Sequence, residues 1–315
     1  MNPINRILRG EAKIGRVGYS ICASIFRKAV SSNDKKRLKK QHFDHEDISI
    51  LKDIPYINDK KKSHLLDIYF PKGREEENLP LLFDCHGGGF MYGYKELNAP
   101  SAYYLTRLGY KVSLFSYTLA PKADLETIVK EAYTALSFLY EKREEYHLDF
   151  SHLYFVGDSA GAMIALLLNA LLKEEEMRKA FNVKALPLSP LRLVFFSPMM
   201  RMIRGDEFAV PYKNTLPDPA KKKESYPYLA YPLETITREN YTPIFFTTSE
   251  EDSLKEDSYL LAMKLDLLAL PYEFHCQEKK EGKEFPHVYP VIYPEWEESE
   301  KIYKDCASFL KKEAL

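Results

Sequence analysis

Residues 153–161 read Leu-Tyr-Phe-Val-Gly-Asp-Ser-Ala-Gly, an apolar run of strand length that ends in the pattern Gly-x-Ser-x-Gly. The small residues around Ser159 suit a tight turn from a strand into a helix, and a helical pattern follows over 160–174. Such a turn lifts the serine hydroxyl above the sheet, at the positive end of the helix. The pattern therefore predicts Ser159 as a nucleophile; the alternative is an ordinary serine at a helix N-cap.

The chain on both sides of this turn alternates between apolar runs and helical patterns. The expected strands cover 65–70, 81–85, 111–117, 153–156, 191–196, 243–247 and 272–276, and the expected helices cover 98–108, 124–142, 160–174, 254–269 and 296–312. This alternation is typical of an α/β fold, a mostly parallel central sheet with helices on both faces. Continuously apolar runs such as 193–196 indicate strands buried on both faces, and the more alternating strands near 50–70 indicate an antiparallel edge.

A second motif follows the expected strand 81–85 and reads His86-Gly87-Gly88-Gly89-Phe90. Successive glycines let the backbone come close to a substrate and direct N–H groups at one point, as acyl transfer requires for a developing oxyanion. We expect an oxyanion hole made by two amides of Gly87, Gly88 and Gly89 together with the amide of Ala160. A phosphate-binding loop is the alternative, but no Gly-Lys-[Ser/Thr] follows the glycines. His86 itself is predicted to hold the shape of the loop.

A nucleophilic serine needs a base, and the base needs an orienting acid. Because the chain order around this kind of turn is nucleophile, acid, histidine, the base should lie after the last strands, at His275 or His287. His275 falls inside the expected strand 272–276, so His287 is predicted as the base. The acid should follow the strand 243–247, and Asp252 is predicted there, with Glu251 as the main rival and Asp257 expected inside the next helix. The same acidic run could instead be a solvated turn.

Two segments do not fit the alternation. Residues 198–241 contain six prolines and no long period, which indicates a cap insertion over the carboxyl ends of the strands. Residues 1–40 hold eleven Lys or Arg against two acids, a charge of +9, and four apolar residues recur there at helical spacing: Ile14, Val17, Ile21 and Ile25. We expect this stripe to dock on the chain's own domain, with a solvated basic turn after it. The alternative is an amphipathic helix that contacts anionic lipid.

The composition of the 315-residue chain restricts the class of protein. Apolar residues make up 45% and charged residues 29%, as in soluble globular proteins, and the net charge of −1 provides no global attraction for nucleic acid. Four widely separated cysteines indicate neither a disulfide framework nor a zinc site. No apolar run is long enough to span a membrane, and the N-terminal pattern lacks secretory flanks. We expect a cytoplasmic protein that needs no cofactor and no metal.

The motifs together resemble the hormone-sensitive lipase-like branch of the α/β-hydrolases, which includes many short-chain esterases and acetyl esterases. The resemblance rests on His86 to Phe90 with Gly93, on Tyr117-Thr118-Leu119-Ala120-Pro121, on 157–161, on Asp252-Ser253-Leu254 and on His287, and it covers about residues 64–312. It implies an α/β-hydrolase domain over 46–315, an N-terminal cap segment over 1–45 and a cap insertion at 198–241. It also implies Ser159 as nucleophile, His287 as base, Asp252 as orienting acid, and the glycine run with Ala160 as the oxyanion hole.

The chain departs from the family pattern around the site. Thr118 and Lys122 stand where relatives usually have Arg and Glu, Ser253 replaces a frequent Pro, and Val288 replaces a usual Gly. These changes concern the range of substrates and leave every catalytic group in place. The resemblance implies a serine esterase (carboxylesterase or acetyl esterase) acting on small, short-chain acyl esters. The alternatives are a peptidase or amidase, a membrane-surface lipase that uses the basic N-terminus, and a non-catalytic ligand receptor. The edge strand expected after Tyr272 would let two subunits pair into an oligomer.

Overall fold

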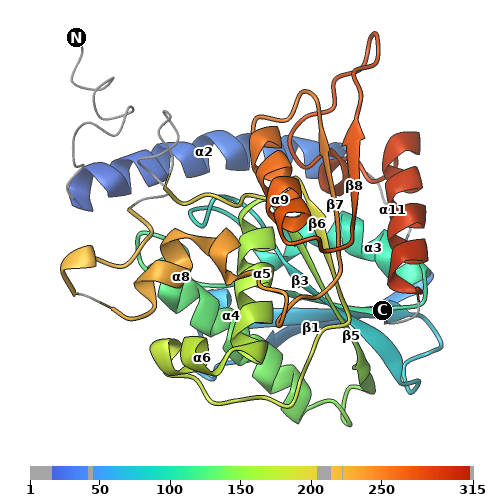
Figure 1. The fold of residues 1–315 in the computed structure, drawn as a ribbon. Coiled ribbons are helices and arrows are strands. Elements are labelled where there is room, and N and C mark those ends of the chain that lie inside the picture. Colours follow the sequence, from blue (N-terminus) through green and yellow to red (C-terminus); the bar gives the residue numbers. More distant parts are fainter. Residues whose placement is uncertain (1–15, 42–44, 204–213, 222, 313–315) are drawn as a thin grey trace.

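The computed structural model describes residues 16–41, 45–203, 214–221 and 223–312. An eight-stranded sheet forms its centre, in the order β1-β2-β4-β3-β5-β6-β7-β8 (Figure 1). The strands are β1 (Ile48–Pro55), β2 (Leu65–Pro71), β3 (Leu79–Cys85), β4 (Lys111–Phe115), β5 (Leu148–Asp158), β6 (Arg192–Phe196), β7 (Ile244–Ser249) and β8 (Tyr272–Gln277). Strands β3 to β8 run parallel, and β1 and β2 add the antiparallel edge that the sequence predicts.

Helices cover both faces of this sheet. They are α2 (Arg16–Lys40), α3 (Ala99–Arg107), α4 (Leu125–Glu141), α5 (Ala160–Lys173), α6 (Glu175–Phe181), α8 (Tyr226–Ala230), α9 (Lys255–Leu267), α10 (Tyr289–Ile292) and α11 (Glu297–Leu310), with short 3-10 turns η1 (Lys62–His64), η2 (Lys95–Asn98), η3 (Pro219–Lys221) and η4 (Pro232–Thr235). One buried cluster joins α4, α5 and α9 to one face, and a second joins α3 and α11 to the other. The α/β architecture predicted from the sequence is confirmed.

The central strands are buried on both faces, as their continuous apolar runs predict. All five residues of β6 and all six of β7 are buried. Phe195 points into the cluster beneath α5, whereas Val194 and Phe196 pack on the side of α11. Burying a large apolar side chain contributes roughly 1.5–3 kcal/mol, so these strands form a stable platform for the loops at their carboxyl ends.

Helix α2 crosses the molecule above the carboxyl ends of the strands (Figure 1). The predicted basic turn is wrong, because α2 continues through the basic run to Lys40. The predicted docking stripe is also wrong: Ile21 and Ile25 are 55% and 64% exposed, whereas Tyr19 and Ala23 are buried. Ile14 and the side chain of Val17 lie outside what the structure describes. The face of α2 that packs on the domain includes hydrogen-bond donors. They are needed there because α2 lies over loop backbone, whose carbonyl groups need partners.

The cap insertion expected at 198–241 contains η3, α8 and η4, and residues 204–213 lie outside the described part of the chain. A hydrogen bond of 2.8 Å between the hydroxyls of Tyr19 and Thr215 joins this insertion to α2.

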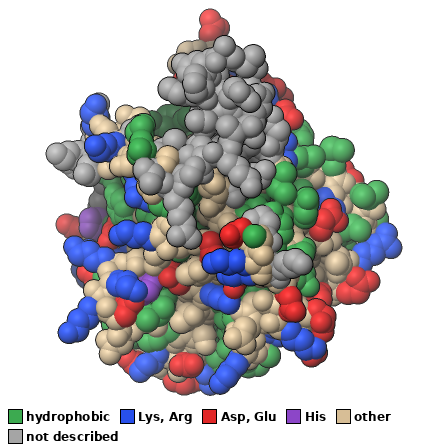
Figure 2. Space-filling view, turned by 90° about the vertical axis from the view of Figure 1, so that its left-hand side faces the viewer, with side chains coloured by type: hydrophobic (Ala, Val, Ile, Leu, Met, Phe, Trp, Pro, Cys, Tyr) green, Lys and Arg blue, Asp and Glu red, His purple; other side chains and the backbone are tan. Residues whose placement is uncertain are grey.

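On the face shown in Figure 2, basic and acidic side chains are interspersed, in keeping with the net charge of −1. No helix among the described residues is both long and apolar enough to cross a membrane.

Gly161, in the first turn of α5, sets the distance between this helix and β3. A Cβ atom at this position would lie 1.8 Å from the carbonyl oxygen of Cys85, so the two backbones are in direct contact. We expect Gly161→Ala to lower the free energy of unfolding by about 3 kcal/mol, because helix and strand must separate to admit the methyl group. Urea unfolding followed by circular dichroism measures this loss.

Gly73→Ala is the matched control for this prediction. Gly73 has a positive φ of 82°, but no atom lies within 4 Å of its missing Cβ. The control therefore carries only the cost of the left-handed backbone, roughly 1 kcal/mol. Equal losses in the two variants would contradict the steric explanation for Gly161.

Candidate active site

Ser159 lies between the end of β5 and the start of α5, in the turn that the sequence predicts. Its backbone angles are φ 51° and ψ −120°, a conformation that costs a non-glycine residue about 1–3 kcal/mol. Its amide donates to the carbonyl of Phe196 on β6 at 2.9 Å, and its carbonyl accepts from Met199 at 3.0 Å. Both neighbours belong to the chain at the end of β6, which therefore holds the strained turn in place.

Three side chains from distant parts of the sequence meet at this turn. His287 Nε2 lies 2.9 Å from Ser159 Oγ, and His287 Nδ1 lies 2.8 Å from Asp252 Oδ1. Ser159 can therefore donate its proton to His287, whose Nδ1–H donates to Asp252. This is the geometry that an activated serine nucleophile requires. The structure brings Ser159, His287 and Asp252 together in the order that the sequence predicts.

Asp252 is held as an anion by its surroundings. Burial opposes ionisation, but the hydrogen bond and the charge of His287 outweigh it, and the amide of Leu254 donates at 2.7 Å, so the pKa of Asp252 falls to about 2. Thr248 Oγ1 donates to the other carboxylate oxygen at 3.0 Å. With both oxygens held, the carboxylate cannot rotate away from the imidazole.

The rival acids have other partners. Glu251 Oε2 accepts from the amide of Phe285 at 2.8 Å, so it supports the loop that carries His287. Asp257 accepts from the amides of Met200 and Arg201 and pairs with the Arg201 guanidinium at 2.6 Å. These two carboxylates brace the loops around the triad.

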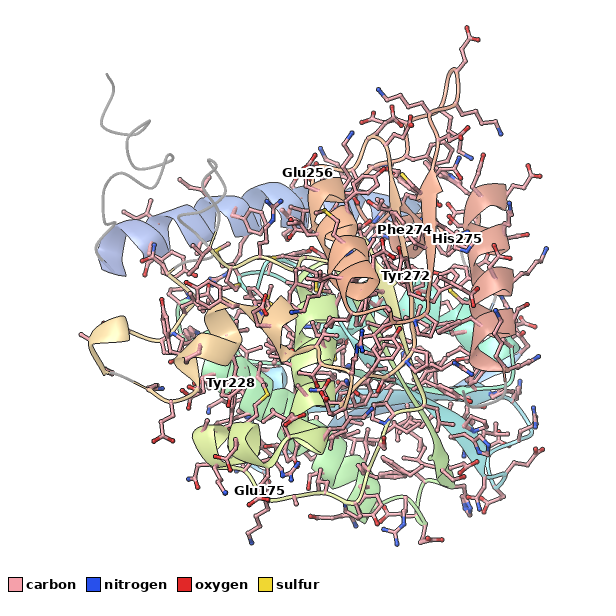
Figure 3. The ribbon with its side chains drawn as sticks, viewed as in Figure 1. Glu175, Tyr228, Glu256, Tyr272, Phe274 and His275 are labelled. Atoms are coloured by element: carbon pink, nitrogen blue, oxygen red, sulfur yellow. The ribbon has the colours of Figure 1, made fainter. Side chains whose placement is uncertain are left out.

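The rival base, His275, lies on the edge strand β8 beside Tyr272 and Phe274 (Figure 3). Its ring packs against Phe245, and its nearest charged partner is Asp305 at 4.0 Å. The structure therefore keeps His275 away from Ser159. This agrees with the prediction that His275, as a strand residue, is not the base.

The glycine loop after β3 presents unused amides near Ser159. Gly88 and Gly89 have φ angles of 105° and 59°, and the carbonyl of Gly88 accepts from the amides of Met91 and Tyr92. In the described part of the chain, the amides of Gly88, Gly89 and Ala160 have no protein acceptor. The Gly87 amide, by contrast, donates to Asp158 Oδ1 at 2.8 Å. Of the predicted oxyanion donors, Gly87 is therefore engaged elsewhere, and the other three amides remain available.

His86 has the structural role that the sequence predicts. Its ring stacks on Tyr117 with centroids 4.2 Å apart, and Nδ1–H donates to the carbonyl of Gly87 at 2.8 Å. Burial lowers the pKa of His86 to about 4, so the ring is neutral at pH 7. The hydroxyl of Tyr117 donates to the carbonyl of His86 at 3.0 Å, which fixes the start of the glycine loop from a second side.

Arg27 of α2 contributes a contact that the sequence did not reveal. Its Nε donates to the carbonyl of Met91 at 2.5 Å, and its Nη2 donates to the carbonyl of Ala120. Arg37 and Gln41 donate to the carbonyl of Ile292, at the end of α10. Helix α2 is thus hydrogen bonded both to the glycine-loop side of the site and to the segment that follows His287. The basic composition of 1–40 was the only signal, and it did not single out Arg27.

Two departures from the family pattern are visible in the geometry. Val288 adopts the left-handed conformation with φ 55°, which explains why glycine is usual at this position and costs the β-branched side chain strain. Its amide donates to Ser197 Oγ at 3.0 Å, and this bond helps to hold the strained backbone. Thr118 joins a buried polar group, with its Oγ1 3.2 Å from His64 Nε2 and its amide on Glu131.

Comparisons with known proteins agree with this fold and site. The sequence profile of the alpha/beta hydrolase fold family matches residues 82–282, so the chain belongs to that family. Within it the chain falls in the hormone-sensitive lipase-like branch, which confirms the resemblance seen in the sequence. A curated relative is a putative alpha/beta hydrolase of Acanthamoeba polyphaga mimivirus, 27% identical over 56% of this chain. The match spans about half (48%) of that relative.

Solved structures show the same fold. Esterase B from Lactobacillus rhamnosis, in a structure with a C4-C4 tributyrin phosphonate, superposes with a TM-score of 0.86 at 22% identity, covering 94% of this chain and 96% of that one. A fungal esterase from Rhizomucor miehei has a TM-score of 0.68 at 20% identity, covering 95% and 97%. An esterase from the bacterial hormone-sensitive lipase family has a TM-score of 0.65 at 16% identity, covering 100% and 99%.

Proposed function

We propose that this protein hydrolyses short-chain acyl esters through an acyl-enzyme on Ser159. The observation that carries the proposal is the continuous hydrogen-bonded path from Ser159 Oγ through His287 to Asp252, next to three amides that have no protein acceptor. A path of this kind activates a hydroxyl, and convergent amides stabilise a tetrahedral oxyanion.

The reaction follows from these positions. Ser159 Oγ attacks the ester carbonyl while His287 Nε2 takes its proton, and the amides of Gly88, Gly89 and Ala160 bind the oxyanion. His287 then returns the proton to the leaving alcohol as the acyl-enzyme forms. Water, deprotonated by His287, attacks the acyl-enzyme, and the collapse of the second intermediate releases the acid and restores the serine. Asp252 stabilises the imidazolium in both steps.

Three features support small acyl groups. Ser159 is only 7% exposed, and α2 lies over the strand ends. The segment after β6 packs closely behind the nucleophile turn, since Met199 and Met200 are buried and the Met199 amide donates to the Ser159 carbonyl at 3.0 Å. The structural relative from L. rhamnosis accommodates a C4 phosphonate, which supports an acyl group of similar size here.

A series of p-nitrophenyl esters from acetyl to dodecanoyl tests this proposal. We expect kcat/KM to be highest between butanoyl and hexanoyl and to fall at least tenfold at dodecanoyl, because the covered site excludes longer chains. The matching p-nitroanilides serve as the control and should react far more slowly. Faster anilide than ester hydrolysis would identify an amidase, and tight ligand binding without turnover of either series would identify a receptor.

A further inference from the structure

Two buried carboxyl groups share one amide group directly behind the glycine loop. Asn98 Nδ2, at the end of η2, lies 2.9 Å from Asp84 Oδ1 on β3 and 2.8 Å from Asp158 Oδ1 on β5. The exposed fractions of Asp84, Asn98 and Asp158 are 2%, 4% and 6%. The mechanism above uses none of the three side chains.

These residues join both ends of the glycine loop to the nucleophile turn. Asp84 lies two residues before His86 of the loop, Asn98 ends η2 eight residues after Phe90, and Asp158 immediately precedes Ser159. Asp158 Oδ1 also accepts the Gly87 amide at 2.8 Å. A change in the charge or spacing of this network therefore changes the direction of the neighbouring Gly88 and Gly89 amides, whose aim determines oxyanion binding.

The network has too few donors for two anions. In the described part of the chain neither Asp84 nor Asp158 forms an ion pair, and the Asn98 amide is shared between them. Burial, together with the charge of Asp158, raises the pKa of Asp84 to about 8 against the opposing hydrogen bond from Asn98. Burial also raises the pKa of Asp158, although Asn98 and the Gly87 amide lower it. With its pKa near 8, Asp84 is mainly a neutral carboxylic acid at pH 7.

The other titratable groups around the pair are either neutral or favour a negative charge on Asp158. Cys85 and Tyr303 are fully buried, and burial raises the pKa of each, so both are neutral. His287 faces Asp158, and its positive charge lowers the pKa of that carboxyl. Because the imidazolium forms during catalysis, its charge favours the ionised form of Asp158 at the moment when the oxyanion hole must hold its shape.

We propose that Asp84 acts as a neutral carboxylic acid that positions the oxyanion loop, and that its ionisation misaligns the loop at alkaline pH. This inference rests on the proposed esterase function. Asp84 touches neither substrate nor the reacting atoms, so it is a positioning residue that acts through Asn98, Asp158 and the Gly87 amide.

Asp84→Asn tests the proposal because asparagine keeps the oxygen that accepts from Asn98 and cannot ionise. For the wild-type protein we expect kcat to fall about 30-fold between pH 7 and about pH 9.5 while KM changes little, because the oxyanion hole acts in the transition state. The variant should lose less than about threefold over the same range. Superimposable profiles would overturn the proposal and leave the esterase function standing.

Ser101→Ala is the matched control. Ser101 is buried on α3 and bonds to the Tyr303 hydroxyl at 2.8 Å, on the same side of the sheet as Asp84. It bonds to neither carboxyl, so this variant should lose some stability yet keep the wild-type alkaline decline. If kcat of Ser101→Ala no longer fell at alkaline pH, looser packing on this side of the sheet, and not Asp84, would control the pH profile. That result would also overturn the proposal.

A measurement on the wild-type protein covers the case in which Asp84→Asn does not fold. Infrared difference spectra should show the C=O stretch of one buried protonated carboxyl at pH 7 that disappears above about pH 8. The rate of Ser159 labelling by a fluorophosphonate should fall over the same interval. If no ester were hydrolysed, the esterase function would fail, and these two readouts would still test Asp84. A pH-independent spectrum would overturn the proposal by itself.

Discussion

Replacing Ser159 with alanine is expected to lower kcat by about 10⁶-fold on the best ester of the series, because no other group can form the acyl-enzyme. The hydroxyl that is removed lies 2.9 Å from His287 Nε2, and the backbone of Ser159 has the strained angles φ 51° and ψ −120°. Stopped assays with purified protein measure the residual rate, and mass spectrometry of the fluorophosphonate-treated protein should show that labelling is lost.

Ser151→Ala is the control for this experiment. Ser151 bonds to Asp149 and His152 on the early part of β5, far from the nucleophile turn. This variant should keep activity and labelling. If Ser159→Ala retained more than about 1% of wild-type kcat, the assignment of the nucleophile would be wrong.

Asp252→Asn is expected to lower kcat by about 10⁴-fold with little change in fold. An asparagine in this place can present its amide nitrogen to His287 Nδ1, which favours the tautomer that carries its proton on Nε2 and cannot accept from Ser159. The carboxylate also stabilises the imidazolium, and the neutral amide does not. Ester hydrolysis and a thermal unfolding curve on the same preparation separate the catalytic loss from any loss of stability.

Glu251→Gln is the control for the prediction that Asp252 is the acid that orients His287. Glu251 is the neighbouring acid, and it accepts from the amide of Phe285 rather than from His287, so this variant should lose less than about tenfold in kcat. A larger loss in Glu251→Gln than in Asp252→Asn would identify Glu251 as the orienting acid. With its pKa near 2, Asp252 stays ionised at pH 5, so a loss of wild-type activity between pH 7 and pH 5 does not come from this group.

The strongest sequence predictions concerned residues whose roles depend on local backbone or on chain order. The turn around Ser159 needs small neighbours, and Gly161 shows why, since a Cβ atom there would lie 1.8 Å from the carbonyl oxygen of Cys85 on β3. Asp252 and His287 follow the strands β7 and β8, and the carboxyl ends of parallel strands meet at one edge of the sheet. Chain order was therefore enough to predict that these residues lie together.

The weaker predictions concerned contacts between segments far apart in the chain. The spacing of Ile21 and Ile25 indicated a docking stripe, but the surface beneath α2 is loop backbone, and Arg27 satisfies its carbonyls. The run of three glycines could not show that the Gly87 amide is already used by Asp158. Which side of a helix is buried, and which amide is free, depends on what the opposing segment presents.

Sequence alone thus predicted the fold class, the family and the three side chains that meet at the turn, because each follows from a local pattern or from the order of strands. Only the tertiary structure decided how α2 is held over the site, which amides of the glycine loop lack a protein acceptor, and that Asp84 and Asp158 share the amide of Asn98. The physical reason is that hydrogen bonds and pKa shifts depend on distance and burial, and residues 84 and 158 acquire both only when β3 and β5 pair.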